Sequence, residues 1–219
     1  MNFRYPIFLD VAGKRCVVTG EGYELPGKVK TLFERGALVT YINPTAEESI
    51  ATLAADGRIH WLKREFEPAD LTDCFLVITD REDNSEVFRL AEERRVLCNA
   101  VDDPEYCRFS FGSVIPRGDL TIAISTNGVA PALAVRLRER FEREIGEEYQ
   151  RFLAILSEMR AEISREISDF CKRRELWYKL VDSEALALLR EGRAEDARTL
   201  LRSLVIEAAA SQPRNESEA

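Results

Sequence analysis

The sequence has few of the residues on which metal and redox centres depend. It holds one histidine, two methionines and five cysteines in 219 residues. A metal centre built on paired histidines is excluded, so we expect His60 to be structural. The cysteines are odd in number and never spaced as Cys-x-x-Cys, which argues against a complete disulfide framework and against a zinc site. We predict reduced thiols, mostly buried in strands, and no bound metal.

Excess positive charge and long apolar runs are also missing. The formal net charge is -8 and the isoelectric point is near 5.0, which argues against broad binding to a nucleic-acid backbone, because that needs a basic face. No apolar run approaches the roughly 20 residues that span a bilayer, and residues 1–10 lack the apolar core of a signal peptide. We therefore expect a cytoplasmic protein with no membrane and no nucleic-acid partner.

A strand, a tight turn and a helix are predicted near the amino terminus. Residues 15–19 form a β-branched apolar run that leads into Gly20-Glu21-Gly22, and apolar residues then recur at helical spacing. Glycine lets the backbone approach a ligand, and a helix that starts there directs free N–H groups at one point. The pattern predicts a phosphate or pyrophosphate site. An ordinary βα turn stays an alternative, because Leu25 stands where a dinucleotide fingerprint has a small residue.

The second predicted strand, residues 37–42, ends at Asn43-Pro44-Thr45. A dinucleotide-binding fold usually places Asp or Glu near this point to hold the adenosine ribose hydroxyls. Asn43 can still hydrogen-bond a hydroxyl, and no arginine lies beside it to neutralise a 2′-phosphate, so NAD is favoured over NADP. A loop asparagine chosen for its turn geometry is the competing interpretation.

The remaining elements follow from hydrophobic periodicity and from the length of the chain. Residues 74–79 form a continuous apolar run, which predicts a strand buried on both faces at the middle of the sheet. With 45% hydrophobic residues, the chain suits one α/β domain and a helical appendage. Further strands are expected at residues 59–63 and 96–100, and helices at residues 47–56, 84–93, 130–144, 147–172, 174–189 and 194–210. Residues 2–9 hold a short apolar element, and the polar residues 211–219 are expected to be disordered.

Two segments in the middle of the chain resemble a known family. Residues 99–104 read Asn-Ala-Val-Asp-Asp-Pro, and residues 117–120, Arg-Gly-Asp-Leu, lead into Ile-Ser-Thr-Asn-Gly at residues 124–128. In this order, and at this spacing from a glycine turn, they resemble the bacterial precorrin-2 dehydrogenase family. Its members include the single-domain dehydrogenase of siroheme synthesis and the amino-terminal part of siroheme synthase. The likeness covers residues 6 to about 142.

The resemblance implies a fold and an activity. It implies a Rossmann-like parallel sheet in residues 1–112, a dimerisation segment in residues 113–146 that exchanges between subunits, and a helical domain in residues 147–219. The implied reaction is the NAD-dependent oxidation of precorrin-2 to sirohydrochlorin by a homodimer. Iron insertion by the same protein stays open, as does the branch of tetrapyrrole synthesis that it serves.

The resemblance also implies site residues. Asp102 corresponds to the family's catalytic aspartate, although the same residue also suits a cap on the turn before Pro104. The residues implied in NAD binding are Gly20, Gly22, Tyr23, Glu24, Asn43, Pro44, Thr45 and Thr79. The residues expected to hold the tetrapyrrole and its carboxylates are Thr126, Asn127, Gly128, Arg117 and Arg136. For either arginine, a place on a solvated helix face is the competing interpretation.

The glycine turn departs from the family pattern. Glu21 replaces the middle glycine, and a carboxylate beside a pyrophosphate is repulsive unless it points away. A second hypothesis therefore stands beside the enzyme: a non-catalytic Rossmann module that binds a nucleotide or tetrapyrrole as a regulator or scaffold.

Overall fold

The structure is a computed structural model that describes residues 4–211. It divides into two compact units, Met1–Phe111 and Gly112–Ala219, and each is described by itself. Within the described residues, no helix combines the length and the apolar character that crossing a membrane requires.

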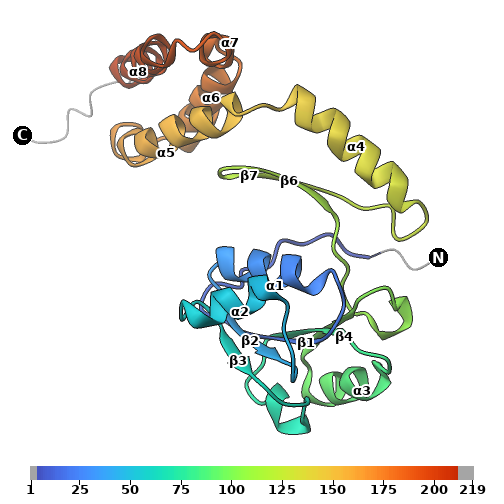
Figure 1. Cartoon of the computed structure of the whole chain (residues 1–219). Helices are drawn as coiled ribbons and strands as arrows, with labels where there is room; N and C mark the ends of the chain where they lie inside the picture. Colours follow the sequence, from blue (N-terminus) through green and yellow to red (C-terminus); the bar gives the residue numbers. More distant parts are fainter. Residues whose placement is uncertain (1–3, 212–219) are drawn as a thin grey trace, which may run out of the picture. The chain divides into compact units, whose positions relative to one another are not determined.

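The first unit is a five-stranded parallel sheet with strand order β3-β2-β1-β4-β5 (Figure 1). The strands are β1 Arg15–Gly20, β2 Leu38–Ile42, β3 His60–Leu62, β4 Leu76–Asp80 and β5 Leu97–Ala100. The helices between them are α1 Leu25–Glu34, α2 Glu48–Ala55 and α3 Ser85–Arg94, with short 3-10 turns at η1 Pro68–Leu71 and η2 Pro104–Tyr106. The strand order reverses between β1 and β4, so the predicted α/β fold with a Rossmann-like sheet is confirmed.

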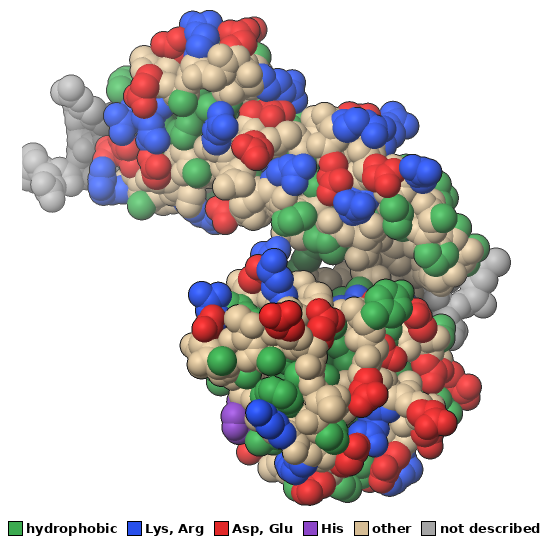
Figure 2. Space-filling model, in the orientation of Figure 1, with side chains coloured by type: hydrophobic (Ala, Val, Ile, Leu, Met, Phe, Trp, Pro, Cys, Tyr) green, Lys and Arg blue, Asp and Glu red, His purple; other side chains and the backbone are tan. Residues whose placement is uncertain are grey.

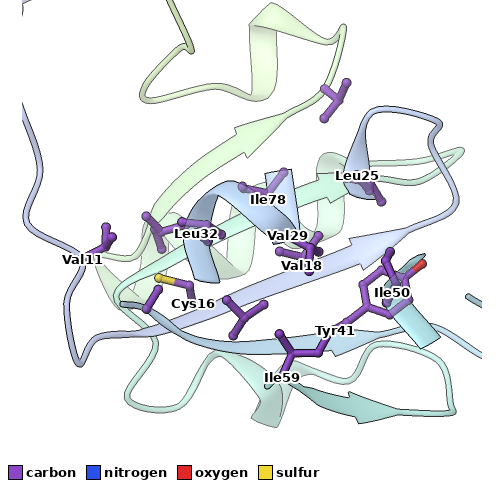
Figure 3. Packing of buried hydrophobic residues seen from close by; sticks show 14 residues of the cluster. Val11, Cys16, Val18, Leu25, Val29, Leu32, Tyr41, Ile50, Ile59 and Ile78 are labelled. Atoms are coloured by element: carbon purple, nitrogen blue, oxygen red, sulfur yellow. The ribbon is translucent and has the colours of Figure 1, made fainter. Parts of the chain in front are cut away.

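Helices cover both faces of this sheet because side chains along each strand point alternately to opposite sides. Val18 and Ile78 pack against Val29 and Leu32 of α1, as Figure 3 shows. Val17 lies on the other face, in a cluster with residues of α3. The β1 and β4 side chains are almost fully buried, which explains why both read as continuous apolar runs.

The second unit begins with an antiparallel hairpin of β6 Ser113–Arg117 and β7 Leu120–Ile124. Five helices follow: α4 Pro131–Glu144, α5 Glu148–Glu166, α6 Phe170–Val181, α7 Ala185–Arg190 and α8 Ala194–Ala210. Buried residues of α5 to α8, with Ile167 between α5 and α6, form one apolar cluster, so this unit has a core of its own. On the face drawn in Figure 2, acidic side chains gather on the part of the first unit that carries α3.

Several details differ from the sequence-based expectations. The strand at the middle of the sheet is β1, and β4 is its neighbour. The helix expected over residues 147–172 breaks at residues 167–169, where Ile167 has extended φ and ψ angles. The helix expected over residues 174–189 is also interrupted, because α6 ends at Val181 and α7 starts at Ala185. No regular element forms in residues 4–9, and the tail expected to be disordered lies, from residue 212 on, outside the described residues.

The five cysteines are free, as predicted, but only two are buried in strands. Cys16 and Cys98 are fully buried, and burial raises the pKa of each thiol to about 12. Cys74 and Cys107 are half-buried in loops, and Cys171 is exposed on α6. His60 lies exposed on β3, and within the described residues no group of three or more His, Cys, Asp or Glu side chains is placed to hold a metal ion.

Candidate functional site

The candidate site lies where β1 and β4 end side by side. Gly20 and Asp80 are paired in the sheet register, and the Glu21 N–H donates to the Asp80 carbonyl at 3.1 Å. Gly20 has φ +118°, a conformation that other residues rarely adopt, and a Cβ there would collide with the Asp80 backbone. The carboxyl edge of the sheet at this reversal of strand order is where open α/β sheets bind ligands.

The backbone of the turn presents hydrogen-bond donors. The N–H groups of Gly22, Tyr23 and Glu24 have no acceptor among the described residues, and they lie just before α1. Free N–H groups at the amino end of a ten-residue helix suit a phosphate or pyrophosphate. A Cβ at Gly22 would overlap the Asp80 carboxylate, so a larger residue at this position would displace the Asp80 side chain.

Asn43 organises a second corner of the site, at the end of β2. Its side chain is buried, and its Nδ2 donates to Glu21 Oε1 at 3.3 Å, to the Thr45 carbonyl at 3.0 Å and to Thr45 Oγ1 at 3.2 Å. The Asn43 carbonyl accepts from Trp61 Nε1 at 2.9 Å. A cavity of about 90 Å³ lies here, lined by residues of the glycine turn, the end of β2 and the start of α2. Pro44, the next residue along the chain, is exposed.

Tyr41 joins this corner to the turn. Its hydroxyl donates to the Gly20 carbonyl at 2.7 Å. Burial, followed by the negative charges of Glu21 and Glu47, raises the pKa of Tyr41 to about 12, so the hydroxyl stays protonated and keeps donating.

Carboxylates surround the reversal point. Burial, then the charge of Asp102 and then that of Glu24 raise the pKa of Asp80 above its ordinary value. Asp102 follows β5, is exposed, and has φ +55°, a left-handed conformation that is uncommon outside glycine. A cleft of about 620 Å³ opens beside Asp80, and its charged lining residues are Glu21, Glu65, Asp80, Arg81, Glu82, Asp83 and Glu86.

Thr79 supports the loop after β4. The residue is fully buried, and its hydroxyl donates to Asn84 Oδ1 at 2.9 Å. The same oxygen accepts from the Arg81 N–H at 3.1 Å, and Asn84 Nδ2 donates to Asp103 Oδ2 at 3.5 Å. Thr79 therefore helps to fix Asn84, and Asn84 orders the loop that follows Asp80 and links it to Asp103.

The residues expected to bind the tetrapyrrole belong to the second unit. The Arg117 guanidinium donates to the carbonyls of Pro116, Ile145 and Glu142 and so closes the end of α4. Arg136 is exposed and pairs with Glu139 at 2.8 Å.

The loop between β7 and α4 holds the other expected residues. Thr126 Oγ1 accepts from the Ala130 N–H at 3.3 Å, and Asn127 and Gly128 have φ +51° and +80°. This loop is a tight turn that leads into α4.

The structure brings the glycine turn, Asn43 and Thr45 together at one edge of the sheet, with Asp102 close enough to shift the pKa of Asp80. Sequence reasoning missed Glu21 as a partner of Asn43, and it missed the roles of Asp80 and Asn84. Sequence reasoning did place residues 79–82 at the same edge of the sheet as the glycine turn, but it assigned no role to Asp80 itself.

Family comparisons agree with this architecture. A model described as "Putative NAD(P)-binding" matches residues 7–113, one described as the central part of a sirohaem biosynthesis protein matches residues 117–144, and one described as the sirohaem synthase dimerisation region matches residues 148–205. The three matched segments follow one another along the chain, so residues 7–205 are similar to sirohaem biosynthesis proteins. The predicted resemblance is thereby confirmed.

Siroheme synthases from several bacteria are similar to the chain. The protein of Sodalis glossinidius is 34% identical over 90% of this chain and 42% of its own length. That of Methylobacillus flagellatus is 35% identical over 91% of this chain and 44% of its own length. The chain thus spans less than half the length of these siroheme synthases.

A solved structure titled "SirC, precorrin-2 dehydrogenase" has the same fold. It superposes with a TM-score of 0.76 at 22% identity and covers 91% of this chain and all of its own.

Proposed function

We propose that this chain binds NAD and oxidises precorrin-2 to sirohydrochlorin. The observation that carries the proposal is the glycine turn with unpaired N–H groups beside Asp80 and Asp102, in a chain that resembles sirohaem biosynthesis proteins and whose fold matches a precorrin-2 dehydrogenase. Free cysteines are typical of proteins in a reducing compartment, so we also propose the cytoplasmic location that the sequence predicts.

The residues of the turn fit a dinucleotide. The N–H groups of Gly22, Tyr23 and Glu24 would hold the pyrophosphate at the start of α1, and Asn43, Pro44 and Thr45 would line the ribose site. When bound, NAD supplies the hydride acceptor. The Asp80 carbonyl accepts a hydrogen bond from the Glu21 N–H and so fixes the backbone of the turn.

Asp102 is proposed as the catalytic carboxylate. Hydride loss leaves positive charge in a macrocycle, which a nearby carboxylate stabilises, and the same group can accept the departing proton. Asp102 is exposed at the ligand-binding edge, and Asp80 beside it holds its own proton more tightly than an ordinary Asp. Of the two carboxylates Asp102 is the exposed one, so the proton-accepting role is assigned to Asp102.

The second unit is proposed to supply the contacts to the substrate's carboxylates. Arg136 is exposed, so its guanidinium is accessible despite its surface pair with Glu139. Arg117, Thr126, Asn127 and Gly128 stay candidates, with Arg117 and Thr126 acting through the backbone that they order.

The test is anaerobic incubation of the purified protein with precorrin-2 and NAD, following NADH and sirohydrochlorin absorbance. Asp102→Asn is the informative variant, because asparagine tolerates the left-handed conformation that alanine would find strained. We expect turnover to fall about 100-fold with the melting temperature unchanged. Asp103→Asn is the matched control and should retain turnover.

Retained turnover in Asp102→Asn would remove the assigned role from that residue. Absence of both NAD binding and turnover in the unmodified protein would favour the non-catalytic module. Repeating the assay with ferrous ion separates a chelatase step, in which Asp102 would take pyrrole protons or hold the incoming metal.

A further inference from the structure

We propose that Glu21 supplies the carboxylate that holds the adenosine ribose hydroxyls and that it thereby selects NAD against NADP. The inference rests on the proposed dinucleotide site and assigns a function to the residue that replaces a glycine in the turn. A dinucleotide fold normally takes this carboxylate from the end of its second strand. Here that strand ends in Asn43, an amide.

The structure places the carboxylate of Glu21, a residue of the glycine turn, at the end of the second strand. Glu21 Oε1 accepts from Asn43 Nδ2 at 3.3 Å and from Thr45 Oγ1 at 3.5 Å. Asn43 is buried, its main-chain carbonyl accepts from Trp61 Nε1, and its side-chain amide donates to the Thr45 carbonyl, so the residue is a fixed support. The Glu21 side chain is therefore directed to the end of β2, and Glu21 itself remains exposed.

Because the Glu21 carboxylate points toward the end of β2, it need not repel a pyrophosphate bound at the glycine turn. The Glu21 N–H is engaged by the Asp80 carbonyl, while the unpaired N–H groups belong to the next three residues. The carboxylate and the free donors thus serve different corners of the site. A ribose diol carries two hydroxyl donors, and a carboxylate with a defined orientation can accept from both of them.

The charge around this corner disfavours a 2′-phosphate. Glu21 and Glu47 both line the small cavity, and both charges contribute to the raised pKa of Tyr41. Among the described residues that line it there is no lysine, arginine or histidine. A 2′-phosphate would therefore meet two carboxylates with no cation to neutralise it.

The experiment measures binding to the full chain by calorimetry, with NAD and NADP as the two probes. We expect the unmodified protein to bind NAD at least about tenfold more tightly than NADP. Glu21→Gln should weaken NAD binding about tenfold and reduce the difference between the two probes to about threefold or less. Glu48→Gln is the matched control. It removes the same charge from a residue next to Glu47 that lines neither the 620 Å³ cleft nor the 90 Å³ cavity, so the preference for NAD should be unchanged.

The outcomes separate this inference from the function on which it rests. If the unmodified protein prefers NAD and Glu21→Gln retains the full preference, Glu21 is not the determinant, but the dinucleotide site stands. A preference of the unmodified protein for NADP would also overturn the inference alone. If neither probe binds a protein that melts cooperatively, the proposed function fails, and the role of Glu21 fails with it.

Discussion

At the residue scale, Asp80 explains why the turn has its composition. Its backbone pairs with Gly20 and leaves no room for a side chain there, and its carboxylate occupies the space that a Cβ at Gly22 would need. The carboxylate is partly buried near two other acids and has no hydrogen-bond partner among the described residues. An ionised group in this setting is a cost to folding, which is typical of sites arranged for ligands.

Replacing Asp80 with Asn should stabilise the protein at neutral pH. The folded-state pKa of Asp80 is raised, so its contribution to stability is fully present below the ordinary value of 3.8 and is lost as the pH rises through the raised pKa. We expect Asp80→Asn to raise the melting temperature by about 2 °C at pH 7. The difference should shrink as the pH falls toward 4, as followed by circular dichroism.

Asp83 provides a control of opposite sign in the same loop. Hydrogen bonds from Ser85 lower the pKa of Asp83, so its contribution is present above its ordinary pKa and is lost as the pH falls through the lowered value. Asp83→Asn should therefore lower the melting temperature at pH 7. Equal responses of the two variants would contradict the assignment of the Asp80 shift to its surroundings.

At the element scale, strands and helices could be predicted where one physical pattern dominates. The β-branched run of β1, followed by glycines, predicted both the strand and the start of the ligand-binding edge. The same pattern could not order the sheet, because β1 and β4 are both buried on both faces and differ only in their neighbours. The direction of the Glu21 side chain could not be predicted either, because it depends on a contact with Asn43 at the end of the neighbouring strand β2.

The break between α5 and α6 shows the limit of helical periodicity. Ile163 and Ile167 are both fully buried, so the apolar spacing continues through a residue that is not helical. Phe170, the next residue in that pattern, is 68% exposed and starts a new helix. Asp169 caps this helix by accepting from the Lys172 N–H at 2.8 Å, a local hydrogen bond that hydrophobic periodicity does not detect.

Removal of that cap should destabilise the second unit. We expect Asp169→Ala to reduce the free energy of unfolding by about 1 kcal/mol, measured by urea denaturation. Asp169→Asn is the conservative comparison and should cost about half as much or less, because asparagine is also a good capping residue. If alanine and asparagine prove equal to the unmodified protein, the cap does not contribute to stability.

At the scale of the whole molecule, the open property is the oligomeric state. The match of residues 148–205 to a dimerisation region suggests a homodimer, which the family resemblance also predicted. Large apolar side chains are exposed in the second unit, including Val129 in the loop before α4 and Leu133 in its first turn. Exposed apolar groups on a segment expected to exchange between subunits are suited to burial against a second copy.

We therefore predict a homodimer of two 24.9-kDa chains, whose melting temperature rises with protein concentration because association stabilises the folded chain. Leu133→Glu places a charge on α4 and should raise the dimer dissociation constant at least about tenfold in sedimentation velocity. Leu38→Glu, at an exposed position of the first unit, is the control and should leave the constant unchanged, while Ile206→Glu on α8 tests the region that matches the dimerisation model. A monomer at every concentration would refute the predicted assembly, whereas a dimer that resists Leu133→Glu but not Ile206→Glu would move the interface from α4 to the carboxyl-terminal helices.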